Sequence, residues 1–200
     1  MNARNLITWG VAPVIAGIFL AAAVLALAKP SPDVAPGGFD ATDVTGADWG
    51  RDFHLSGDDG RPRELADFRG RVVALYFGYT HCPDVCPLTL AELGRAVRLL
   101  GEEGSRVQVL FVTVDPRRDK PKALARYVRS FDPAFLGLYG SDAQIARAAD
   151  EFKVEAGEHH SIPVFLIDPG GRLRLVAHAD ARAESIAHDV RLLLRQAKPG

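Results

Sequence analysis

The 200-residue chain has none of the sequence features that mark a nucleic-acid-binding protein. Its 24 Lys and Arg residues are nearly balanced by 25 Asp and Glu residues, and the sequence contains no basic block and no alternation of basic with aromatic residues. This composition predicts no nucleic-acid partner. Internal repeats and low-complexity tracts are also absent, so the length predicts one globular domain plus an appended segment.

Cysteine is nearly absent, and both cysteines, Cys82 and Cys86, lie in the single stretch 76–87 (YFGYTHCPDVCP). The apolar run at 72–77 predicts a buried strand before them, and apolar residues at helical spacing predict a helix over 88–100. Thiols at a helix N-terminus are favoured as thiolates, the form that attacks disulfides and binds metals. The spacing is compatible with a shared soft metal ion, a disulfide or two buried structural residues.

Charged residues are missing from residues 6–28, which are long enough to cross a bilayer as a helix. Arg4 precedes this stretch and acidic residues follow it, which predicts a cytoplasmic N-terminus (1–5) and a transmembrane anchor in membrane lipid. The alternative is a cleaved secretory signal, since residues 26–28 form an A-x-A sequence. Both interpretations export the domain.

No Arg-rich, Ser-rich presequence precedes the apolar stretch. We therefore expect a single-pass protein of the bacterial inner membrane with its domain facing the periplasm. The alternative is the mitochondrial inner membrane, with the domain facing the intermembrane space.

Proline and glycine are frequent in residues 29–50, which predicts a flexible linker, and residues 51–200 predict the folded domain. The expected fold class is α/β, a thioredoxin-like three-layer sandwich with an N-terminal β-hairpin extension, preceded by one transmembrane helix. After the hairpin, strands are predicted at 72–77, 107–114, 136–139, 164–167 and 173–177, and helices at 88–100, 122–131, 142–152 and 183–196.

Pro163 stands before a predicted strand, where a thioredoxin-like fold often has a cis proline against the cysteine loop. A trans bond is the alternative, because only about one X–Pro bond in twenty is cis in folded proteins.

From about Phe53 to the C-terminal helix, the chain resembles the Sco/SenC family of copper-binding assembly factors for cytochrome c oxidase. The motifs that carry the resemblance are YFGYTHCPDVCP at 76–87, TVDPRRD at 113–119, FLGLYG at 135–140, and His160-Ser161 followed by Phe165-Leu166. The resemblance implies that Cys82, Cys86 and His160 bind one copper ion, as Cu(I) or Cu(II). It also implies a metallochaperone for the dinuclear copper centre of oxidase subunit II, served by an upstream copper chaperone or thiol reductant.

Two thiolates and one imidazole are suitable ligands for copper, while Zn(II) would accept the same donors with a fourth ligand. His159 departs from the family pattern, which commonly has an acidic residue at that position. Either His159 or His160 is then the imidazole ligand, or His159 tunes His160. The alternative function is a thiol-disulfide oxidoreductase that reduces the subunit II cysteines before metallation. Cys82 and Cys86 would then be a redox-active catalytic pair, and His160 would be dispensable.

Other polar residues near the cysteines have both a structural and a functional interpretation. His81 is either solvated or tunes the pKa of Cys82. Asp115 and Asp119 either form a turn and a helix cap, or orient a ligand or contact a partner near the metal. Asp84 is first a helix cap and second a functional carboxylate.

Overall fold

The computed structural model describes residues 38–154 and 162–197. From Phe39 onward these residues belong to one compact unit, built on an eight-stranded mixed sheet in the order β1-β8-β7-β4-β5-β6-β2-β3. The strands are β1 (Thr42–Asp43), β2 (His54–Gly57), β3 (Pro62–Glu64), β4 (Val72–Gly78), β5 (Val107–Thr113), β6 (Leu136–Tyr139), β7 (Val164–Ile167) and β8 (Leu173–Ala177).

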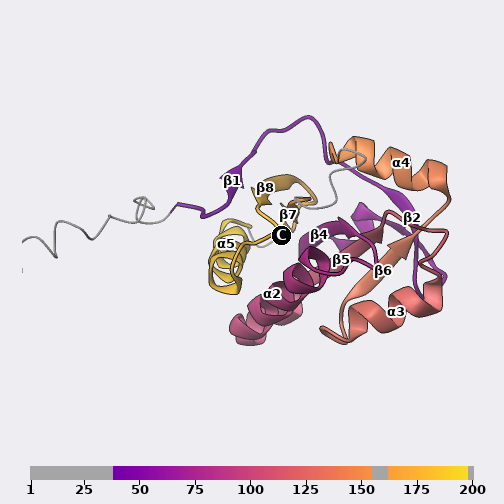
Figure 1. The fold of residues 1–200 in the computed structure, drawn as a ribbon. Coiled ribbons are helices and arrows are strands. Elements are labelled where there is room, and N and C mark those ends of the chain that lie inside the picture. The colour runs from indigo at the N-terminus through magenta and orange to yellow at the C-terminus, as the bar shows by residue number, and fades with distance from the viewer. Residues whose placement is uncertain (1–37, 155–161, 198–200) are drawn as a thin grey trace, which may run out of the picture. The chain divides into compact units, whose positions relative to one another are not determined.

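The helices form the outer layers of an α/β sandwich. Within the described residues they are α2 (Val85–Leu99), α3 (Pro121–Arg129), α4 (Asp142–Glu151) and α5 (Ala183–Gln196), with two short 3-10 helices at Leu65–Phe68 and Gly101–Arg106. Helices α2, α3 and α5 cover one face of the sheet and α4 lies on the other (Figure 1). The predicted three-layer arrangement is therefore present.

The centre of the sheet is the parallel pair β4 and β5, in which Val72 lies opposite Val107 and Gly78 lies opposite Thr113. All seven residues of each strand are buried, because helices cover both faces of the sheet here. Strand β7 runs antiparallel on the other side of β4, with Val164 opposite Tyr76. The end of β4 thus lies beside the start of β7.

Helix α2 begins directly after Asp84, which occupies the predicted cap position, three residues before the apolar periodicity that starts at residue 88. Pro87 is tolerated there because the first turn of a helix contains N–H groups that have no intrahelical partner. The helix buries Leu90 and Leu93 against the sheet. The early start places Cys86 inside the first helical turn.

The predicted hairpin is formed by β2 and β3, which pair antiparallel. Strand β2 also pairs with β6, with Ser56 opposite Tyr139, so the hairpin extends one edge of the sheet. Gly60 occupies the turn with φ = +81°, a backbone conformation that glycine adopts without a steric penalty.

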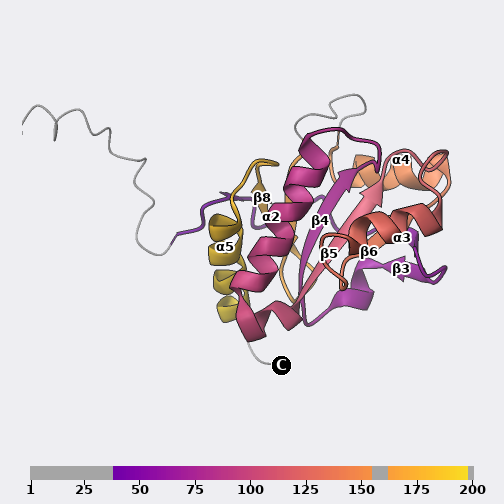
Figure 2. The same cartoon turned by 60° about the horizontal axis from the view of Figure 1, so that its bottom comes forward.

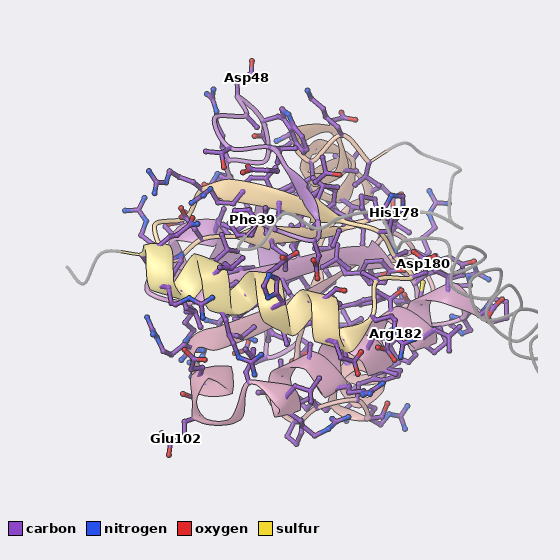
Figure 3. All side chains as sticks on the ribbon, turned by 90° about the vertical axis from the view of Figure 1, so that its left-hand side faces the viewer. Phe39, Asp48, Glu102, His178, Asp180 and Arg182 are labelled. Atoms are coloured by element: carbon purple, nitrogen blue, oxygen red, sulfur yellow. The ribbon has the colours of Figure 1, made fainter. Side chains whose placement is uncertain are left out.

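Residues 39–50, which composition assigns to the linker, instead contact the folded domain. Strand β1 pairs with β8, and the Asp189 carboxylate accepts hydrogen bonds from the backbone of Asp40 (2.7 Å) and Ala41 (2.9 Å). Phe39 lies close to α5, with Asp48 at the far end of the same segment (Figure 3). Trp49 packs edge-on against Phe165. Residues 39–50 contain no proline, and the side chains of Phe39 and Trp49 pack against the core, which explains why this segment is held to the domain.

The membrane prediction concerns residues that the structure does not describe. Within 38–154 and 162–197, no helix has the length and apolar character needed to cross a bilayer. The predicted N-terminus (1–5) and anchor (6–28) lie outside these ranges. Of the two alternatives for Pro163, the structure has the trans bond, since no cis peptide bond occurs in the described residues.

Candidate metal centre

Cys82 and Cys86 lie at the corner where β4 leads into α2. A short loop at the upper end of β4 connects to the helix, which lies in front of the sheet (Figure 2). Both are free thiols, 7% exposed for Cys82 and 1% for Cys86. The structure therefore brings the two predicted ligands to one place.

The sulfur of Cys82 is surrounded by donors from the start of α2. The backbone N–H of Cys86 donates to Sγ of Cys82 over 3.4 Å. Burial disfavours the thiolate and acts to raise the pKa of Cys82. The backbone donors of Asp84 and Cys86 outweigh that effect and hold this pKa below its ordinary value. Cys82 is the thiol that ionises more readily.

The sulfur of Cys86 lies deeper, among aromatic rings. The hydroxyl of Tyr76 donates to Sγ of Cys86 over 3.6 Å. A Cβ at Gly78 would come within 2.9 Å of this sulfur and 2.8 Å of the Phe111 ring, so the absence of a side chain there makes room for Cys86. Burial, reinforced by the neighbouring Cys82 sulfur, raises the pKa of Cys86 to about 11. The two thiols are thus chemically unequal.

Asp119 is buried, 1% exposed, and joins the cysteine loop to the end of β5. Its carboxylate accepts hydrogen bonds from the backbone N–H of Thr80 (2.9 Å), the hydroxyl of Thr80 (2.5 Å) and the hydroxyl of Thr113 (2.6 Å). The cap interpretation is wrong for Asp119, because Lys120 occupies the N-cap position of α3. The sequence indicates Asp119 as a candidate but gives no sign of its partners Thr80 and Thr113.

The remaining predicted residues have mainly structural contacts. His81 directs Nδ1 toward Asp119 Oδ1 (3.3 Å), and its side chain is 56% exposed. Asp115 pairs with Arg118 in the turn after β5. Asp84 occupies the N-cap position of α2, but its side chain makes no capping hydrogen bond.

His159 and His160 lie outside the described residues, in the connection from α4 to β7. The undescribed part of that connection is followed by Ile162 and Pro163 and then by Val164, the first residue of β7. Val164 pairs with Tyr76 of β4, the strand that leads to the cysteines. Assignment of either histidine as a ligand stays a prediction.

The model of the SCO1/SenC protein family matches residues 41–195. The chain belongs to this family. The human mitochondrial protein SCO2 homolog is 44% identical over 153 residues. That match covers 70% of this chain and 58% of the human protein, so the chain spans little more than half the length of this SCO1/SenC relative.

Solved SCO1/SenC structures have the same thioredoxin-like α/β fold. Apo Sco1 of Thermus thermophilus is 38% identical, with a TM-score of 0.70 over 80% of this chain and 99% of that chain. ScoI of Bradyrhizobium japonicum, solved with copper bound, is 31% identical, with a TM-score of 0.62 over 72% of this chain and 98% of that chain. These similarities confirm the predicted family and the thioredoxin-like α/β fold.

Proposed function

We propose that this chain binds one copper ion through Cys82, Cys86 and His160 and helps to metallate the dinuclear copper centre of cytochrome c oxidase subunit II. The observation that carries the proposal is the pair of free, nearly buried thiols at one strand-to-helix corner of a SCO1/SenC domain. Two thiolates and an imidazole are suitable for both Cu(I) and Cu(II). The copper-bound state of the Bradyrhizobium relative supports copper as the metal.

The same proposal includes an anchor at residues 6–28 and a linker that ends near Gly38, where the compact unit begins. We place the domain in the bacterial periplasm, with the mitochondrial intermembrane space as the alternative. The partners are then oxidase subunit II, an upstream copper chaperone or thiol reductant, and the lipid around the anchor.

The test is a copper titration of the reduced compact unit, residues 39–200, against a competing chelator. We expect one equivalent to bind to the wild type. Cys82→Ser/Cys86→Ser and His160→Ala should each weaken binding by orders of magnitude, because each removes a ligand. His159→Ala is the matched control for His160→Ala, and exposed His54→Ala is the control for nonspecific binding to imidazole. Full affinity in His160→Ala with loss in His159→Ala would move the ligand to His159, and full affinity in both would refute the three-ligand site.

The inequality of the two thiols favours a second candidate function, thiol-disulfide oxidoreductase activity. A more acidic, more exposed thiol beside a buried one is suited to forming and then resolving a mixed disulfide. The matched measurement is reduction of a disulfide made from the two copper-ligating cysteines of a subunit II peptide. Activity that survives His160→Ala, together with copper binding that does not require His160, would make the oxidoreductase the better account.

A further inference from the structure

We propose that Asp119 is a positioning residue whose buried carboxylate fixes the loop carrying Cys82 and thereby sets the redox equilibrium of the cysteine pair. The inference deepens the proposed function, because it concerns the same two thiols. It needs no metal, however, and its test is metal-free.

The carboxylate holds Thr80 at two points. Oδ2 accepts the backbone N–H of Thr80 and Oδ1 accepts its hydroxyl, at 2.9 and 2.5 Å, across 39 residues of sequence. Both bonds have a charged acceptor when Asp119 is ionised, which makes them stronger than bonds between neutral groups. Thr80 cannot shift without breaking both bonds.

Asp119 is itself fixed to the sheet. The hydroxyl of Thr113, the last residue of β5, donates to Oδ2 over 2.6 Å. The backbone N–H of Asp119 donates to the carbonyl of Asp115 over 2.9 Å, and α3 begins two residues later at Pro121. Because Asp119 is fixed relative to β5 and α3, its carboxylate holds Thr80 in a fixed position relative to these two elements.

Thr80 lies within the turn that delivers Cys82. The N–H of Cys82 donates to the carbonyl of Tyr79 over 3.2 Å, so residues 79–82 form a tight turn. Upstream, the carbonyl of Gly78 still accepts a backbone hydrogen bond from Val114 (2.8 Å), after which the β4–β5 ladder ends. Beyond the end of the ladder, the two hydrogen bonds from Thr80 to Asp119 hold the backbone of the turn in place.

This restraint bears on the equilibrium between dithiol and disulfide. Oxidation by glutathione disulfide forms the Cys82–Cys86 bond, breaks the glutathione S–S bond and yields two molecules of reduced glutathione. Its equilibrium constant follows the effective concentration of one thiol at the other. The backbone N–H of Cys86 donates to Sγ of Cys82 over 3.4 Å, so this sulfur is held against the residue that carries the second thiol. Releasing Thr80 would spread Cys82 over more positions and make the disulfide easier to reduce.

The experiment compares Asp119→Asn with Asp58→Asn in the full chain, kept metal-free in detergent and equilibrated in glutathione buffers. Asp58 is the matched control, since its carboxylate is also fully buried and accepts hydrogen bonds from the Gly137 N–H (2.9 Å) and Arg129 (2.6 Å), in the turn after β2. Mass spectrometry of quenched samples gives the disulfide fraction, and thermal melting gives the loss of stability that both variants share.

We expect Asp119→Asn to lower the equilibrium constant for disulfide formation about tenfold, which is about 30 mV for this two-electron couple. Asp58→Asn should lose stability but keep the wild-type constant. If the folded Asp119→Asn protein also keeps the wild-type constant, the positioning role is refuted and Asp119 only stabilises the fold. If Asp119→Asn does not fold, Thr80→Ala is the second variant, because it removes only the hydrogen bond from the Thr80 hydroxyl to Asp119. We expect its equilibrium constant for disulfide formation to fall by less than tenfold. An unchanged constant in Thr80→Ala would refute the proposal.

The two proposals can fail separately. Weak copper binding by the wild type, together with a shifted constant in Asp119→Asn, would remove the copper function and keep the positioning role. Copper binding that requires all three ligands, together with an unchanged equilibrium constant for disulfide formation in Asp119→Asn, would keep the copper function and remove the positioning role.

Discussion

Tyr76 and Cys86 are joined in the interior by a hydrogen bond from the phenolic hydroxyl to the thiol sulfur, over 3.6 Å. Tyr76 lies in β4 and is 1% exposed, and burial raises its pKa. A buried hydroxyl generally has a hydrogen-bond partner, and the partner here is a sulfur. The bond anchors Cys86, while Cys82 remains the thiol nearer to solvent.

The Tyr76→Phe substitution removes this donor and leaves the ring packed near Phe111, at a centroid distance of 6.0 Å. We expect the pKa of Cys86 to rise further, because the hydrogen bond favours the thiolate. Copper affinity should fall about two- to tenfold, corresponding to about 0.5–1.5 kcal/mol for one hydrogen bond. Chelator competition on the reduced domain measures the change.

Tyr127→Phe is the matched control for Tyr76→Phe. The hydroxyl of Tyr127 is also buried, but it has no hydrogen-bond partner in the described part of the chain. Removing an unsatisfied buried hydroxyl should leave copper affinity unchanged and raise the free energy of unfolding by about 1 kcal/mol. Equal losses of affinity in the two variants would show that the Tyr76 hydrogen bond is not the cause.

The inequality of the two thiols predicts different alkylation by iodoacetamide in the reduced, metal-free protein. Only the thiolate reacts, so the rate for Cys82 should reach half its maximum below pH 9.0, since its pKa is lowered from that value. Cys86 should react slowly until the pH approaches its pKa of about 11. Mass spectrometry of the labelled peptides separates the two rates. In guanidinium chloride both cysteines should react alike, and equal rates in the folded protein would contradict the assignment.

Most of the fold could be predicted from the pattern of apolar residues. The bounds of β6, β7, β8 and α5 are those predicted, because each has a short apolar run or a continuous helical face between clear turn residues. The start of α2 could not be predicted from periodicity and followed only from the assignment of Asp84 as its cap. Its first turn consists of Val85, Cys86 and Pro87, and the apolar face begins only beyond them.

The candidate site was only partly predictable. The cysteines were found because strand, thiols and helix adjoin in sequence. The contacts from Asp119 to Thr80 and Thr113 were not predicted, because they join residues that meet only when β4 and β5 pair. The same reason applies to Tyr76, whose position in an apolar strand gave no sign that its hydroxyl would meet Cys86.

The buried carboxyl of Asp189, in α5, should make the free energy of unfolding depend on pH. Burial raises the pKa of its carboxyl above 3.8, although Asp40 and Ala41 donate to it. A raised pKa means that the folded state binds the proton more tightly than the unfolded state. The resulting stabilisation is complete below pH 3.8 and is lost as pH rises through the raised pKa.

The Asp189→Asn substitution removes this titration. The free energy of unfolding of the wild type, minus that of the variant, should therefore fall as pH rises through that window and be constant above it. Urea unfolding at a series of pH values, at fixed ionic strength, measures the difference. A difference that stays constant from below pH 3.8 to neutral pH would contradict the raised pKa.

Gly78 lies at the end of β4, where an added side chain would meet both the Phe111 ring and the sulfur of Cys86, a proposed copper ligand. A Cβ at this position would lie 2.8 Å from the ring of Phe111 and 2.9 Å from Sγ of Cys86, closer than van der Waals contact allows. Both neighbours are buried in the core, where displacement of a side chain is resisted by close packing. The Gly78→Ala substitution must therefore move Cys86 or Phe111.

We expect Gly78→Ala to cost about 1–3 kcal/mol in the free energy of unfolding, as overpacking of a core does, and to weaken copper binding. Gly60→Ala is the control. Its φ of +81° imposes backbone strain, of about 1–2 kcal/mol, but no atom lies within 4 Å of the added Cβ. The control should lose stability and keep wild-type copper affinity. If Gly78→Ala also keeps that affinity, the position of the Cys86 sulfur does not limit metal binding, and the copper site would have to tolerate displacement of one of its proposed ligands.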